Sequence, residues 1–311
     1  MPALSPKIPD LETLRAGGKR VMALALAAVE TARGTAPLVA LLDRAAREAR
    51  ALVLGLTGPP GVGKSTLTNA LVRRARADGR TVAVLAVDPS SRRTGGALLG
   101  DRARIQTDPE DRGVFVRSMA ARDRLGGLSD DAVAAVVLLR AVFDLVIVET
   151  VGVGQSEADI GLVADTVVLC IQPASGDSLQ FMKAGVMELP DIIVVTKSDM
   201  ADIARRAAAD VSGALSLGGL PTDWTVPVIR LSAASGEGLE AFDAAIAAHR
   251  AHLEQDGRLA TQRAGQAERW VEEAIRLRFG TEGLAFARRM AVAETGPFAR
   301  EAAFAARLTR S

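Results

Sequence analysis

Residues 58–65 combine glycines, a lysine and a serine at a spacing that could bind the phosphates of a nucleotide: Gly58-Pro59-Pro60-Gly61-Val62-Gly63-Lys64-Ser65. They fit the pattern G-x-x-x-x-G-K-[ST], in which glycines let backbone N–H groups turn toward the β- and γ-phosphates. Lys64 would neutralise phosphate oxygens, and the Ser65 hydroxyl would bind Mg²⁺. An apolar run precedes the loop and a helical pattern opens at Thr66, as an anion site at a helix N-terminus requires. The stretch predicts a nucleotide hydrolase.

A second candidate feature is Glu149, which follows the apolar run 143–148. A carboxylate at the end of a strand can hold a metal ion through water. The N–H of Gly152 can then bond the γ-phosphate, which is present before hydrolysis and absent after it. We therefore assign Lys64, Glu149 and Gly152 to catalysis.

A third feature, Thr196-Lys197-Ser198-Asp199, follows the apolar run 192–195. The carboxylate of Asp199 can accept two hydrogen bonds from guanine, and adenine offers no such pair of donors. The stem of Lys197 would stack along the base. The usual GTPase motif is N-K-x-D, in which the asparagine braces the phosphate loop, and Thr196 replaces that asparagine here.

The fourth feature is a run of small residues, Ser232, Ala233 and Ala234, after the apolar run 226–231. Small side chains let a backbone N–H approach the O6 atom of guanine. With the three features before it, this run completes a GTP site along one edge of a sheet, where open α/β folds bind ligands. We expect GTP or GDP and Mg²⁺ as the bound species.

The elements that must position these residues are short apolar runs alternating with helical patterns. Apolar runs without alternation are typical of strands buried on both faces. They predict an α/β P-loop NTPase fold with a mostly parallel central sheet, flanked by helices. The expected strands are 52–56, 82–87, 114–116, 145–148, 166–171, 192–195 and 226–231, and the expected helices are 66–77, 130–142, 178–188, 200–217 and 239–253.

Helical patterns without strands lie on either side of this region. Residues 10–50 repeat apolar positions at helical spacing. Residues 261–279 and 283–308 read as two helices separated by Gly280 and Gly283. We expect a helical N-terminal extension over 1–50, the GTPase domain over 51–256, and a helical C-terminal extension over 257–311.

Composition restricts the partners and the compartment. A formal net charge of +1 gives no global attraction to nucleic acid or anionic lipid. The charge-free apolar stretch 132–139 is far shorter than the ~20 residues of a membrane span. Residues 19–29 continue as a helix pattern rather than a signal peptide. We therefore expect a cytoplasmic protein, with neither nucleic acid nor a membrane as partner, and with its single cysteine, Cys170, in the core.

Three longer stretches resemble the switch segments of the MeaB/ArgK family of P-loop GTPases, which includes the methylmalonic aciduria type A proteins. They are residues 86–101 (AVDPSSRRTGGALLGD), 149–157 (ETVGVGQSE) and 176–183 (GDSLQFMK). The sequence T-K-S-D is also similar to a base motif used in that family. The resemblance runs from about residue 10 to 255.

The resemblance implies that Ser65, Asp88, Asp101 and Glu149 surround Mg²⁺, directly or through water, that Asp101 also belongs to the catalytic residues, and that Lys64 stabilises transition-state charge. Family members are GTPase chaperones that gate adenosylcobalamin delivery to an acyl-CoA mutase and protect that mutase. The implied partner is therefore an adenosylcobalamin-dependent acyl-CoA mutase of the methylmalonyl-CoA mutase type. The segment with Asp177, Gln180 and Lys183 would face it. A homodimer is also implied, although the tail after Arg258 is shorter than the family's helical arm.

Two other functions remain alternatives. A nickel metallochaperone GTPase would carry His-rich tracts or metal-spaced cysteines, and this chain has only His249, His252 and Cys170. The two histidines, at i and i+3, could bind a metal, but a solvated helix face is the favoured interpretation. A P-loop kinase of the ArgK type would need an acceptor pocket, for which the sequence shows no signature.

Overall fold

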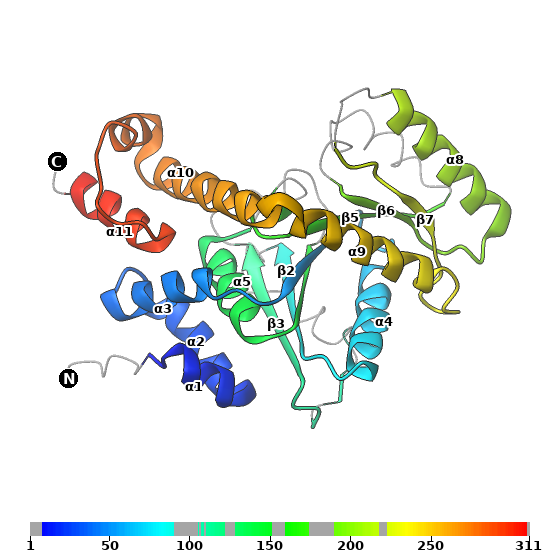
Figure 1. Cartoon of the computed structure of the whole chain (residues 1–311), viewed down its shortest axis with the longest axis horizontal. Helices are drawn as coiled ribbons and strands as arrows, with labels where there is room; N and C mark the ends of the chain where they lie inside the picture. The colour runs from blue at the N-terminus through cyan, green and yellow to red at the C-terminus, as the bar shows by residue number, and fades with distance from the viewer. Residues whose placement is uncertain are drawn as a thin grey trace.

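A parallel sheet lies at the centre of the protein (Figure 1). The computed structural model describes residues 8–89, 105, 107, 108, 110–121, 128–150, 159–173, 190–217 and 223–309, with the backbone alone for 88, 89 and 121. These residues form a seven-stranded sheet in the order β3-β2-β4-β1-β5-β6-β7, in which every neighbouring pair is parallel. The strands are β1 (Leu52–Thr57), β2 (Val82–Pro89), β3 (Val114–Ala121), β4 (Leu145–Thr150), β5 (Thr166–Ile171), β6 (Ile192–Val195) and β7 (Val228–Arg230).

Helices cover both faces of this sheet, which confirms the predicted fold class. One hydrophobic cluster joins α4 and α9 to one face, and two others join α1–α3, α5, α10, α11 and α8 to the opposite face. The helices are α1 (Leu11–Ala16), α2 (Gly18–Thr31), α3 (Ala36–Arg47), α4 (Lys64–Ala77), α5 (Asp130–Val142), α8 (Ala201–Leu217), α9 (Leu239–Glu254), α10 (Arg258–Ala287) and α11 (Pro297–Leu308), with the short 3₁₀ helices η1 (Ile160–Leu162) and η3 (Gln255–Gly257).

The strand order places the end of β1 where a ligand site is expected. The chain places β2, β3 and β4 on one side of β1 and β5, β6 and β7 on the other. The carboxyl end of β1 therefore lies between those of β4 and β5, with Leu56 opposite Glu149 and Thr57 opposite Leu169. Open α/β sheets bind ligands at such a point, where the strand order reverses.

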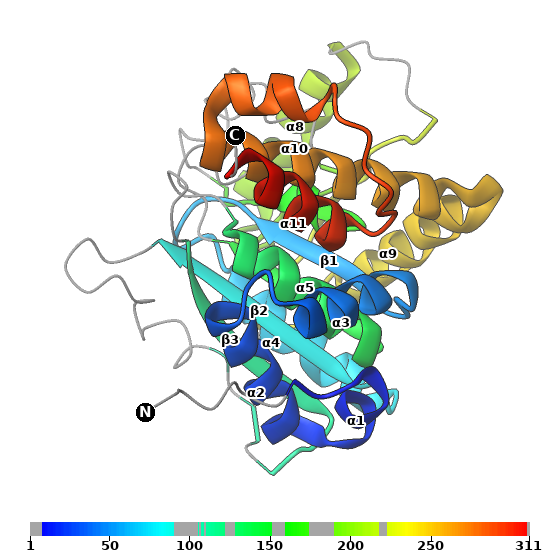
Figure 2. The same ribbon diagram turned by 90° about the vertical axis from the view of Figure 1, so that its left-hand side faces the viewer.

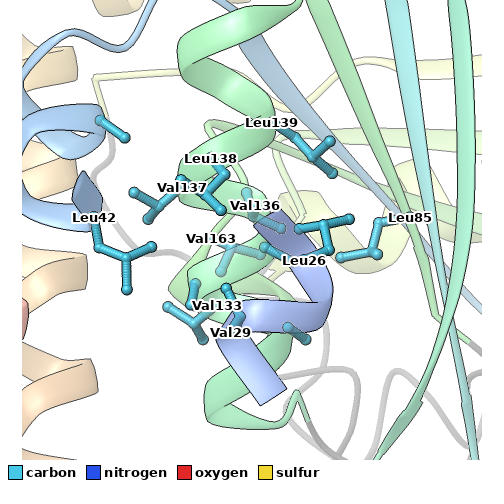
Figure 3. Packing of buried hydrophobic residues seen from close by; sticks show 14 of the residues in the cluster. Leu26, Val29, Leu42, Leu85, Val133, Val136, Val137, Leu138, Leu139 and Val163 are labelled. Carbon is cyan, nitrogen blue, oxygen red and sulfur yellow. The ribbon is translucent and has the colours of Figure 1, made fainter. Parts of the chain in front are cut away.

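The helices from the two ends of the chain pack together with α5 in one core. The largest cluster contains side chains from α1–α3, α5, α10 and α11 (Figure 2). Figure 3 shows the centre of this cluster, where Val137 of α5 lies opposite Leu42 of α3, and Leu26 of α2 approaches Leu85 of β2. Every residue of α5 from Ala132 to Ala141 is buried, because helices pack on it from several directions.

Several predicted element bounds are corrected. The helix expected over 283–308 is wrong, because α10 continues to Ala287 and α11 begins only at Pro297. Proline lacks the N–H that a helix interior needs and is tolerated in the first turn, so it marks a new start. Gly280 does interrupt α10, with φ 72°. Strand β3 runs five residues beyond the predicted 116, to Ala121. The helix expected over 178–188 lies outside the described residues.

Candidate functional site

The glycine loop follows β1 and leads directly into α4. Gly58, Gly61 and Gly63 have φ values of 134°, 77° and 105°, a region that side chains other than glycine rarely adopt. At Gly58 a Cβ atom would lie 2.1 Å from the carbonyl oxygen of Cys170 in β5. The loop therefore passes too close to the neighbouring strand for any side chain at this position. Helix α4 begins at Lys64, so its N-terminus directly adjoins the loop, as anion binding requires.

Lys64 is held against its own loop. Its side chain is 6% exposed, and its Nζ donates to the carbonyl oxygens of Gly58 at 2.6 Å and Pro59 at 2.9 Å. These contacts keep the ammonium over the loop rather than in solvent. A buried ammonium at a helix N-terminus is suited to neutralise phosphate oxygens.

Glu149 lies directly beside the start of α4. Its Oε1 accepts a hydrogen bond from Ser65 Oγ at 2.7 Å, and its Oε2 accepts one from Thr68 Oγ1 at 2.9 Å. Glu149 is 7% exposed. Ser65 and Glu149 were predicted to share a site, whereas Thr68 was not predicted. The spacing of three residues from Ser65 could have revealed it, since residues i and i+3 share one face of a helix.

The donor set fits a magnesium ion. A serine hydroxyl and a carboxylate within 2.7 Å of each other supply the hard oxygen ligands that Mg²⁺ prefers. The backbone of Asp88 lies near the end of β2 at the same edge of the sheet, one residue past Val87, which pairs with Thr150. The side chain of Asp88 and the whole of Asp101 and Gly152 lie outside the described residues.

Thr196 contacts the phosphate loop from across the sheet edge. Its Oγ1 lies 2.7 Å from the carbonyl oxygen of Val62, in the loop, and 3.1 Å from that of Ile171 at the end of β5. The side chain is 4% exposed. The hydroxyl thus ties the loop to the segment that carries the base motif. It makes a bracing contact of the kind that the sequence analysis attributes to the asparagine of the usual motif.

The rest of the base motif lies beside the run of small residues. Lys197 adopts a left-handed backbone conformation, with φ 54°, and donates from Nζ to Gln172 Oε1 at 2.9 Å. The N–H of Ser198 donates to the carbonyl oxygen of Leu231, the residue before Ser232. Asp199 is exposed. The base motif after β6 and the run of small residues after β7 therefore lie side by side, joined by the hydrogen bond from Ser198 to Leu231.

The run of small residues forms a tight turn after β7. The N–H of Ser232 donates to the carbonyl oxygen of Glu237, and the N–H of Gly236 donates to that of Ser232. Ser232 is buried, Ala233 is half-buried and Ala234 is exposed. The exposed part of this turn is backbone with small side chains, which permits close approach of a ligand.

Cys170 and His249 are both buried in the fold. Burial raises the pKa of the Cys170 thiol to about 12, and the thiol lies in the core as expected. The solvated face predicted for the histidine pair is wrong for His249, which is 2% exposed. Its Nδ1 lies 2.9 Å from Thr166 Oγ1, and its Nε2 lies 3.3 Å from Asp191 Oδ1. Helix α9 turns this position toward β5, a tertiary contact that the i, i+3 spacing does not reveal.

Two features are absent from the described residues. These residues contain no group of three or more His, Cys, Asp or Glu side chains that could hold a metal ion. None of their helices is both long and apolar enough to cross a membrane. The predicted partner-facing residues Asp177, Gln180 and Lys183 lie outside the part of the chain that the structure describes.

The sheet order, the glycine loop and the carboxylate beside it define a P-loop nucleotide hydrolase. Comparison with known proteins narrows this class. A family model described as methylmalonyl Co-A mutase-associated GTPase MeaB matches residues 21–282. A protein of Pyrococcus horikoshii named "Putative GTPase" is 42% identical over 274 residues, which cover 85% of this chain and 84% of that protein.

Two further comparisons agree. The mitochondrial methylmalonic aciduria type A homolog of Mus musculus is 38% identical over 226 residues, which cover 71% of this chain and 54% of that protein. A crystal structure of an LAO/AO transport system kinase has a TM-score of 0.68 at 29% identity and covers 90% of this chain and 88% of that one. This chain belongs to the MeaB family of methylmalonyl Co-A mutase-associated GTPases. It binds guanine nucleotide and hydrolyses GTP.

Proposed function

We propose that this GTPase is a chaperone of an adenosylcobalamin-dependent acyl-CoA mutase of the methylmalonyl-CoA mutase type. It would gate the loading of adenosylcobalamin and protect the mutase, with GTP hydrolysis as the timing signal. The observation that carries the proposal is the phosphate loop with Glu149 bonded to Ser65, in a chain whose family is described by its association with that mutase.

The proposal assigns the phosphate-binding role to residues 58–66 and the metal-binding role to Ser65, Glu149, Asp88 and Asp101. Magnesium would neutralise charge on the β- and γ-phosphates when bound. Lys64 would add positive charge at the same oxygens, because its ammonium already lies over the loop. Glu149 would orient the Ser65 hydroxyl through the 2.7 Å hydrogen bond. Gly152 would sense the γ-phosphate through its N–H.

The base-reading role falls to the turn that carries Lys197 and Asp199. Asp199 is exposed at the carboxyl end of β6, beside the turn at Ser232. Its carboxylate would accept hydrogen bonds from the two adjacent donors of guanine, and a backbone N–H of residues 232–234 would meet the guanine O6.

Two features of the assembly belong to the same proposal. The segment with Asp177, Gln180 and Lys183 would transmit the nucleotide state to the mutase. The helical extension 257–311 would contribute to a homodimer, and 1–50 would be a helical N-terminal extension of the GTPase domain over 51–256. Size-exclusion chromatography with light scattering tests the dimer, which a monomeric mass at micromolar concentration would contradict.

The decisive experiment combines the purified chain with the adenosylcobalamin-dependent acyl-CoA mutase of the same organism. We expect GTP turnover to rise as mutase is added. We also expect cofactor loading, followed by the absorbance of cobalamin, to differ between GTP and a non-hydrolysable analogue. If the mutase neither binds nor changes turnover, the chaperone role is refuted while the GTPase activity stands.

Two controls separate the chaperone from its alternatives. Lys64→Ala should nearly abolish turnover with and without mutase, whereas Arg205→Ala, on the exposed face of α8, should change neither. Nickel uptake in equilibrium dialysis would favour a metallochaperone. A phosphorylated acceptor detected with labelled GTP would favour a kinase.

A further inference from the structure

A cavity of about 590 Å³ lies between helices from both ends of the chain, away from the glycine loop. Residues of α3, α5, α10 and the start of α11 line it, and these helices lie close together in Figure 2. Most of the wall is apolar, including Val133 and Val137 of α5, Trp270 of α10 and Phe298 of α11. A volume of this size lies in the range of small-molecule sites.

One charged side chain in this wall lacks a close partner. Arg140 of α5 is 9% exposed, and its Nε has no hydrogen-bond partner among the described residues. No carboxylate in that part of the chain lies within ion-pair distance of its guanidinium. Burial, and then the nearby charge of Arg263, lower the pKa of Arg140 to about 10, so the group still carries its charge at neutral pH.

The acids nearby are already engaged. Asp165 is fully buried and forms a bidentate ion pair with Arg263, whose Nε and Nη2 lie 2.8 and 2.7 Å from the two carboxylate oxygens. Asp43 accepts hydrogen bonds from the first N–H groups of α11. Glu254 is bonded to Arg250 at 2.8 Å. None of these carboxylates pairs directly with Arg140, and a buried cation without a paired anion is costly.

A second polar atom in the same wall lacks a partner. The Nε2 of Gln266 donates to the carbonyl oxygens of Gly161 and Ala164, at 3.1 and 2.7 Å, and this fixes the orientation of the amide. Its Oε1 is buried without a hydrogen-bond partner among the described residues. Native interiors rarely leave such atoms unpaired, so this acceptor calls for a donor such as a bound water molecule, whereas the guanidinium of Arg140 calls for an acceptor.

We propose that this cavity binds a small amphipathic carboxylate. The carboxylate pairs with the guanidinium of Arg140, and the apolar chain lies along the valines of α5. Guanidinium and carboxylate match in charge and geometry, and the apolar wall excludes a fully hydrated anion such as phosphate.

The site is distinct from the nucleotide site. The carbonyl oxygen of Arg140 accepts hydrogen bonds from the N–H groups of Arg50 and Ala51, both at 2.9 Å, immediately before β1. The glycine loop leaves the opposite end of β1, ~20 Å away for a strand of six residues. GDP affinity therefore serves as an independent check that a variant is folded.

Isothermal titration calorimetry with octanoate and its neutral counterpart octanamide tests the proposal. We expect octanoate to bind the wild-type chain and octanamide to bind at least tenfold more weakly, because the amide has no charge to offset that of Arg140. Arg140→Met keeps the length of the side chain and removes the charge, and it should weaken octanoate binding at least tenfold. Arg205→Met, on the exposed face of α8, is the matched control and should bind octanoate as the wild type does.

A second variant keeps the test valid if Arg140→Met does not fold. Ala264 is exposed on α10 and lines the cavity, so Ala264→Phe should narrow the cavity without disturbing the core. We expect it to bind GDP normally and to lose octanoate. The proposal is overturned if the wild type does not bind octanoate, if octanamide binds equally well, or if either folded variant binds octanoate as the wild type does.

Discussion

Replacing Thr196 by valine tests whether this residue holds the phosphate loop. The substitution keeps the shape of the side chain and exchanges the hydroxyl for a methyl group. It removes the hydrogen bond of 2.7 Å to the carbonyl oxygen of Val62 and the contact of 3.1 Å to that of Ile171. The carbonyl of Ile171 keeps the N–H of Thr196 as a donor, so the loss falls on Val62.

The magnitude follows from burial. Thr196 is 4% exposed, and a buried acceptor that loses its donor costs ~1–3 kcal/mol. Part of this cost lowers the free energy of unfolding. The part that loosens the loop weakens nucleotide binding, and ~1–2 kcal/mol corresponds to a roughly 5- to 30-fold increase in the Kd for GDP. Preference for GTP over ATP should not change, because Asp199 would still read the base.

The assay is titration with a fluorescent GDP analogue, together with urea unfolding of the same samples. Thr196→Ser keeps the hydroxyl and should bind GDP within about twofold of the wild type. Thr196→Asn restores the usual motif and should bind at least as well as Thr196→Val. A folded Thr196→Val protein with an unchanged Kd for GDP would show that this hydroxyl stabilises the fold without bracing the loop.

Three further substitutions and one labelling experiment test other parts of the site and fold. Asp199→Asn should shift preference from GTP toward xanthosine triphosphate in competition binding, since the amide can donate to the extra carbonyl of xanthine, and unchanged preference would refute the base assignment. Gly58→Ala should prevent nucleotide binding and lower the urea midpoint, because its Cβ would meet the carbonyl oxygen of Cys170 at 2.1 Å. The thiol of Cys170 should resist a thiol reagent at pH 8 until the chain unfolds, because burial raises its pKa to about 12; rapid native labelling would contradict this burial. Burial acts to raise the pKa of Asp144, but hydrogen bonds from the N–H and hydroxyl of Thr81 and the charge of Arg50 lower that pKa overall. The ionised carboxylate therefore stabilises the fold above the unfolded pKa of 3.8, and this stabilisation is lost as pH falls below that value. In urea unfolding, the stability advantage of the wild type over Asp144→Asn should shrink below this pH, and an advantage that stays constant with pH would refute the role of the carboxylate.

Most of the fold was predictable because it is encoded locally. Apolar runs such as 52–56 and 145–148 gave β1 and β4 nearly to the residue, since strands buried on both faces have no polar side. The helices of the C-terminal extension were harder to predict. Their apolar positions continue with helical spacing through 283–308, and this spacing hid the break that Pro297, tolerated only in the first turn of a helix, marks at the start of α11.

The amino-acid sequence by itself determined the glycine loop, the lysine over it and the class of nucleotide hydrolase, because each of these depends on residue types a few positions apart. Tertiary structure alone decided the contacts between distant positions. Thr196 meets Val62 across 134 positions, and Asp43 caps the start of α11 across 255. It also buried His249 against β5 and left the Nε of Arg140, at a cavity wall, without a hydrogen-bond partner among the described residues. These depend on how the helices pack on the sheet, and local periodicity does not encode which faces meet.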